Sequence, residues 1–177
     1  MPRTVKEQNN IRPFQKATLD ALCLVKANLI IVEAPVGAGK SYIVRRIFED
    51  ESLAGHPIIL IYPTKILMNA QIYALKKELL NIWYWPDEPE VSAELTLFEY
   101  STDALIRYIR NHPEIVRLDK SEIIGQVLRS HQFLSRKNII VTTPDVLHLI
   151  KKGFYRGSQR LEALLNKTIV VFDEFHL

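Results

Sequence analysis

Short apolar segments alternate along this chain with longer segments in which apolar residues recur every three or four positions. The short segments cover residues 28–34, 57–63, 94–100, 138–144 and 168–174. Most of them are apolar throughout rather than alternating, which is typical of strands buried on both faces. The pattern therefore predicts a mostly parallel sheet.

The longer segments have the period of amphipathic helices. They cover residues 13–27, 40–52, 65–82 and 120–136. In the segment 65–82, the leucines and isoleucines fall close to one face and the charged residues lie mostly elsewhere. Alternation of strands and helices predicts an α/β fold with helices on both faces of the sheet.

One stretch interrupts this alternation. Residues 83–90, "WYWPDEPE", contain two prolines, and we expect them to form a loop. Aromatic residues at a helix exit usually cover a local core, and base stacking is the alternative interpretation of this stretch.

Composition limits the classes of protein to consider. The 177 residues are 47% hydrophobic and 24% charged, enough for one substantial core, so we expect a single domain over 1–177. The net charge of +3 is too small to indicate nucleic-acid binding by itself. The single cysteine excludes an internal disulfide, and no Cys/His spacing suits zinc. No apolar segment resembles a membrane span or a signal peptide, so we expect a cytoplasmic protein without a membrane partner.

Polar and unusual residues follow the predicted strands. The segments "EAPVGAGKS", "YPTK", "TTPD" and "DEFH" stand at four strand ends. Ligands of open α/β sheets bind beyond the carboxyl ends of the strands. We therefore expect these segments to gather at one edge of the sheet and to form the functional site.

The first of these segments has the form of a phosphate-binding loop, G-x-x-x-x-G-K-[ST], with Ala34 in place of the first glycine. Glycines let backbone amides face a phosphate, and the following helix adds its unpaired N–H groups. In this interpretation Lys40 contacts the β- and γ-phosphates and is catalytic, and Ser41 binds Mg²⁺. The alternative is an ordinary glycine turn with a solvated lysine. The predicted loop consists of Ala34, Pro35, Val36, Gly37, Ala38, Gly39, Lys40 and Ser41.

Two adjacent carboxylates close the last apolar segment, "TIVVFDEFH". Asp173 is the predicted Mg²⁺ ligand, and Glu174 is the predicted catalytic residue that orients or activates the attacking water. The alternative is a strand that simply ends in solvent, where both residue types are common.

Together these segments resemble the superfamily 2 DExH-box helicases. "APVGAGKS" is similar to their motif I, "DEFH" to motif II, "YPTKILMNAQ" to motif Ia and "TTPDVL" to motif Ib, while "IRPFQ" resembles the element whose glutamine reads adenine. The resemblance implies a RecA-like P-loop NTPase domain that uses ATP and Mg²⁺, with Arg12 and Gln15 near the adenine. It also implies contacts to the backbone of a single-stranded nucleic acid from Pro63, Thr64 and Lys65, and from Thr143, Pro144 and Asp145.

Within this superfamily, "YPT", "T-x-P-D" and "FDEFHL" resemble the helicase component of class 1 (type I) CRISPR interference systems. That likeness implies antiviral defence, a CRISPR interference complex and a nuclease as partners, and DNA rather than RNA as the tracked strand. Two departures stand against the motif Ia pattern: Lys65 replaces a frequent arginine, and Gln71 is displaced by one residue.

Helicases of this superfamily have a second RecA-like domain, and the sequence reaches only Leu177, just past the acidic motif. We therefore expect a domain that is incomplete at its C-terminus and, in isolation, inactive or weakly active. Two other hypotheses remain open: a non-catalytic module that binds a nucleotide or nucleic acid, and another kind of P-loop ATPase.

Overall fold

The computed structural model describes residues 11–24, 32, 38–49, 57–79, 81–87, 92–129, 137–152 and 168–173. The chain divides into two compact units, Met1–Gly55 and His56–Leu177.

The first unit contains two helices that pack against each other, α1 (Pro13–Leu24) and α2 (Lys40–Glu49). Among the described side chains of α2, Ile43, Val44 and Ile47 are buried; Val44 is the neighbour of Ile43, and Ile47 lies one helical turn further along the same face. Both predicted helices are thus confirmed over their described parts. Of the predicted strand 28–34, only residue 32 is described, so the structure does not test this strand.

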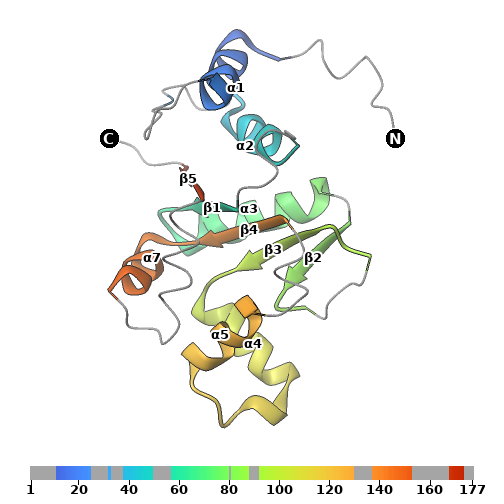
Figure 1. The fold of residues 1–177 in the computed structure, drawn as a ribbon, viewed down its shortest axis with the longest axis vertical. Helices are drawn as coiled ribbons and strands as arrows, with labels where there is room; N and C mark the ends of the chain where they lie inside the picture. Colours follow the sequence, from blue (N-terminus) through green and yellow to red (C-terminus); the bar gives the residue numbers. More distant parts are fainter. Residues whose placement is uncertain are drawn as a thin grey trace. The chain divides into compact units, whose positions relative to one another are not determined.

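The second unit contains a five-stranded sheet in the order β2-β3-β4-β1-β5 (Figure 1). Every neighbouring pair of strands is parallel, as the continuous apolar segments predicted. The strands are β1 (Ile58–Ile61), β2 (Ile82–Trp85), β3 (Leu95–Glu99), β4 (Lys137–Thr142) and β5 (Ile169–Phe172).

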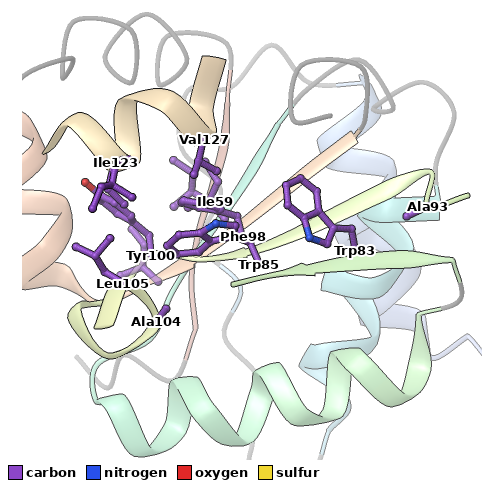
Figure 2. Close-up of a cluster of buried hydrophobic side chains, with 13 residues drawn as sticks. Ile59, Trp83, Trp85, Ala93, Phe98, Tyr100, Ala104, Leu105, Ile123 and Val127 are labelled. Carbon is purple, nitrogen blue, oxygen red and sulfur yellow. The ribbon is translucent and has the colours of Figure 1, made fainter. Parts of the chain in front are cut away.

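Helices cover both faces of this sheet. On one face, α4 (Thr102–Asn111) and α5 (Lys120–Arg129) enclose a core cluster with strand residues such as Ile59, Phe98 and Ile140 (Figure 2). The alternate strand residues, for example Leu60 and Leu97, are also fully buried. Helix α3 (Lys65–Glu78) covers that second face with Met68, Ile72 and Leu75. The remaining described elements of this unit are the short 3-10 helix η3 (Pro113–Ile115) and α7 (Pro144–Lys151).

The prediction of a loop over 83–90 was wrong at its beginning, because residues 82–85 form the strand β2. Trp83 and Trp85 are buried in the core cluster and alternate with half-buried neighbours, which is the pattern of a strand. The local-core interpretation of these two tryptophans is confirmed. The first proline of this stretch, Pro86, comes directly after Trp85, where the strand has already ended.

Other boundaries also differ from the sequence predictions. Helix α3 ends at Glu78 rather than at residue 82, and Asn81 takes a positive φ of 55° before β2 begins. Helices α4 and α7 were not predicted. The predicted helix 120–136 is confirmed as α5 up to Arg129, and residues 130–136 lie outside the described part.

Candidate nucleotide and nucleic-acid sites

The end of the predicted phosphate loop is described in the first unit. Gly39 has a φ of 90°, a conformation that side-chain-bearing residues rarely adopt. A Cβ atom at this position would also lie 2.8 Å from Nε2 of Gln15. The positive φ favours glycine here, directly before Lys40 begins α2, and any side chain at this position would also displace the amide of Gln15. Ser41 lies in the first turn of that helix, and residues 33–37 lie outside the described part of the chain.

Arg12 and Gln15 hold this part of the loop. Gln15 is 4% exposed; its Nε2 donates to the carbonyl of Gly39 (2.8 Å), and its Oε1 accepts from the backbone N–H of Arg12 (2.9 Å). The Nη1 group of Arg12 donates to the carbonyl of Ala38 (2.5 Å). The two residues that the resemblance assigned to the adenine thus brace the phosphate loop, and their contact with adenine stays a prediction.

In the second unit, three strands end side by side at one edge of the sheet. We call the residues that follow β1 (62–65), β4 (143–145) and β3 (100–103) the exits of these strands. The N–H of Tyr62 donates to the carbonyl of Thr142 (3.0 Å), and the N–H of Asp173 donates to the carbonyl of Ile61 (3.1 Å). These bonds tie the ends of β4, β1 and β5 together, so "YPTK", "TTPD" and Asp173 lie at the same edge.

The exits of β1 and β4 lead into helices on opposite faces of the sheet. Helix α3 covers the second face, whereas Val146 and Leu147 of α7 pack against the core cluster on the first. Adjacent parallel strands whose connections diverge in this way leave a crevice, which is where ligands of open α/β sheets bind. The predicted nucleic-acid residues flank this position.

The six predicted nucleic-acid residues differ in exposure. Thr64 is exposed and its Oγ1 accepts from the N–H of Leu67 (3.3 Å), so that it caps α3. Thr143 is only 8% exposed. Lys65 and Asp145 are exposed, and Pro63 and Pro144 are half-buried.

Of the predicted Mg²⁺ ligands, Asp173 has a described side chain, which is 7% exposed at the end of β5. Mg²⁺ prefers carboxylate and hydroxyl oxygens, so the donor type of each predicted ligand, Asp173 and Ser41, fits this ion. Among the described residues, no group of three or more His, Cys, Asp or Glu side chains could hold a metal ion by itself. Glu174 lies outside the described residues.

A polar network that the sequence analysis missed surrounds Glu99, which is 2% exposed at the end of β3. Its carboxylate accepts hydrogen bonds from the hydroxyls of Tyr84 and Ser101, the latter at 2.6 Å, and from the guanidinium of Arg107. Nη2 of Arg107 also donates to the Tyr84 hydroxyl at 2.9 Å. Ser101 in turn accepts from the N–H of Ala104 (3.1 Å) and caps α4.

The network shifts the pKa values of Tyr84 and Arg107. Burial raises the pKa of Tyr84 well above its ordinary value, and the hydrogen bond to Glu99 and the charge of Glu99 raise it further. Burial would lower the pKa of Arg107, but the Glu99 carboxylate and Tyr84 outweigh burial and raise it. The signals in the sequence were Glu99, which directly follows the apolar residues Leu97 and Phe98, and the helix-capping sequence "STD" at 101–103.

Comparison with known proteins identifies the family. A sequence model of the DEAD/DEAH box helicases matches residues 12–177, which is nearly the whole chain. Neither curated proteins nor solved structures gave a match. Within the described residues, no helix is long and apolar enough to cross a membrane. The match covers the phosphate loop, the exits of β1 and β4 and the acidic motif, and the chain belongs to the DEAD/DEAH box helicase family.

Proposed function

We propose that this chain is the first ATP-binding domain of a DExH helicase or translocase that moves along a single-stranded nucleic acid. Membership of the DEAD/DEAH box family implies an ATP-dependent helicase motor. The structural observation that carries the proposal is the meeting of Asp173 with the exits of β1 and β4 at one edge of a parallel sheet.

In this proposal the phosphate loop binds the nucleotide. The Gly39 conformation, braced by Gln15 and Arg12, directs the loop into the first turn of α2, and the N-terminus of a helix attracts phosphate. Lys40 contacts the β- and γ-phosphates. When bound, ATP with Mg²⁺ would supply the free energy of phosphoryl transfer. Ser41 and Asp173 would each offer the ion an oxygen ligand, and Glu174 would accept the proton of the attacking water.

The nucleic acid runs across the exits of β1 and β4. Pro63, Thr64 and Lys65 contact its backbone from one side, and Thr143, Pro144 and Asp145 from the other. Hydroxyls, backbone amides and helix N-termini bind phosphates without reading bases. The capped start of α3 at Thr64 and the start of α7 at Pro144 support this role.

Several finer parts of the proposal rest on the resemblance alone. These are the DExH subtype, DNA rather than RNA as the strand, a CRISPR interference complex with its nuclease as partners, a second RecA-like domain and a cytoplasmic location. A non-catalytic binding module and another kind of P-loop ATPase are the alternatives, and family membership favours neither of them.

The test is ATP hydrolysis by the full-length protein with and without single-stranded DNA. We expect the strand to stimulate hydrolysis and Lys40→Ala to remove most of the turnover, because the phosphate charge is then met only by neutral amides. Lys16→Ala, an exposed lysine in α1, is the matched control and should retain wild-type turnover. Undiminished turnover in Lys40→Ala would contradict the phosphate-loop assignment, and strand binding without any hydrolysis would favour the binding module.

A further inference from the structure

An ion pair joins two helix starts at the edge of the sheet. Nζ of Lys65, the first residue of α3, lies 3.2 Å from Oδ2 of Asp103 in the first turn of α4. The side chains are 56% and 59% exposed. Exposed ion pairs of this kind contribute little to stability and yield readily to a competing charge.

The ion pair bridges the exits that flank β4. In the sheet order, β4 lies between β3 and β1. Lys65 belongs to the exit of β1 and Asp103 to the exit of β3, which are separated by two strand spacings, or roughly 10 Å. The exit of β4 between them begins with Thr143, which is 8% exposed.

Both partners are held in place by the starts of their helices. Thr64 caps α3 directly before Lys65. Ser101 caps α4 and also donates to Glu99, which anchors it to the end of β3. Asp103 therefore presents a fixed negative charge at an edge where the helix N-terminus by itself would attract anions.

We propose that Asp103 competes with nucleic-acid phosphates for Lys65 and restrains access to the exit of β4. The inference deepens the proposed function and rests on it, because it assumes that a nucleic-acid backbone crosses this edge. A phosphate that reaches Lys65 replaces the Asp103 carboxylate, and the ion pair across Thr143 opens. Asp103 thus weakens binding and makes it easier for the strand to leave the site.

The test measures the affinity of the full-length protein for a fluorescent oligo-dT strand by anisotropy at low and high salt. We expect Asp103→Asn to bind about 2- to 5-fold more tightly at low salt, which is the range that an exposed ion pair can supply. The dependence of log affinity on log salt should steepen by up to about 0.7, because Lys65 becomes a full phosphate contact.

Asp87→Asn is the matched control. Asp87 pairs with Lys76 of the same helix α3 at 3.3 Å and is similarly exposed, at 61%. Both substitutions remove one negative charge, but Lys76 lies far along α3 from the exit of β1. We expect Asp87→Asn to leave the affinity within about 1.5-fold of wild type.

A Lys65→Met background separates competition for the lysine from a general effect of charge. If Asp103 acts through Lys65, Asp103→Asn should have little effect once Lys65 is absent. If Asp103→Asn raised the strand affinity equally in both backgrounds, or if Asp87→Asn raised it as much as Asp103→Asn, this inference would be overturned but the proposed function would not. No binding of the strand by the wild-type protein would overturn the proposed function and this inference with it.

Discussion

Glu99 is a carboxylate with almost no access to water, and its position depends on the groups that donate to it. A buried charge is costly unless hydrogen bonds and an opposite charge compensate it. Tyr84, Ser101 and Arg107 provide that compensation from β2, the exit of β3 and α4. Glu99 therefore links β2, β3 and α4 through hydrogen bonds, next to the edge of the sheet where the strands end.

The shifted pKa of Tyr84 makes this network sensitive to alkaline pH. Its ordinary pKa is 10.0, and folding raises it. Above pH 10 the unfolded chain therefore loses this proton before the folded chain does, so the free energy of unfolding falls as pH rises. We expect Tyr84→Phe to lower stability by about 1 kcal/mol at neutral pH, through loss of hydrogen bonds, and to decline less steeply than wild type between pH 10 and 11. Melting temperatures of both proteins across this pH range test the prediction. Equal slopes of melting temperature against pH for Tyr84→Phe and wild type would contradict it.

The two carboxylates of the acidic motif are expected to act differently. Glu174→Gln should slow ATP hydrolysis by at least about 10²-fold and leave ATP binding largely intact, because it would remove the proposed catalytic base. Asp173→Asn should instead weaken the Mg²⁺-dependent part of ATP binding, since the proposed metal ligand, a buried carboxylate, becomes a neutral amide. Titration of nucleotide affinity with Mg²⁺ separates the two, and identical curves for both variants would show that this division of roles is wrong.

At the scale of elements, the functional edge is made by helices that begin directly after strands. Continuous apolar segments predicted β1, β3, β4 and β5. Strands β1, β3 and β4 are buried on both faces, which favours apolar residues without alternation, whereas β5 exposes Val170 and Phe172. The strand β2 was missed because its prolines follow so closely that the whole stretch resembled a loop. Helix α4 was not predicted, although "STD" marks its start with the capping residue Ser101.

The cap at Thr64 allows its structural and binding roles to be separated. Thr64→Ala should lower stability by about 1 kcal/mol, because α3 loses the hydroxyl that accepts from Leu67. Thr64→Asp keeps a good capping group, so its melting temperature should stay near wild type. Its negative charge should nevertheless reduce single-strand affinity and stimulation of ATP hydrolysis more than alanine does.

These measurements distinguish a contact with the strand from a purely structural cap. If Thr64 only caps α3, the alanine variant should be the worse one in both assays, and the aspartate variant should resemble wild type. Thr64→Ser, which keeps both the cap and the hydroxyl, is the control that should retain stability and stimulation together.

At the scale of the whole molecule, parallel strand order decides which distant segments become neighbours. The sequence predicted that "YPTK", "TTPD" and the acidic motif share one edge, because every parallel strand sends its carboxyl end the same way. It could not predict that β4 lies between β3 and β1, since strand order depends on contacts between segments far apart in the chain. The ion pair of Lys65 with Asp103 depends on that strand order, so it could not be predicted from the sequence either.

This arrangement predicts how the full-length protein binds single strands. The proposed contacts at its exits come from hydroxyls, amides and a lysine to phosphates, which carry no base identity, so strands of different sequence but equal length should bind within about threefold of each other. The net charge of +3 gives weak long-range attraction, so affinity should depend on local phosphate contacts. Each contact contributes roughly 0.7 to the slope of log affinity against log salt. Anisotropy titrations with oligo-dT and mixed-sequence strands at two salt concentrations measure both quantities. A strong preference for one sequence, or an affinity independent of salt, would mean that base edges rather than the phosphate backbone are read at these exits.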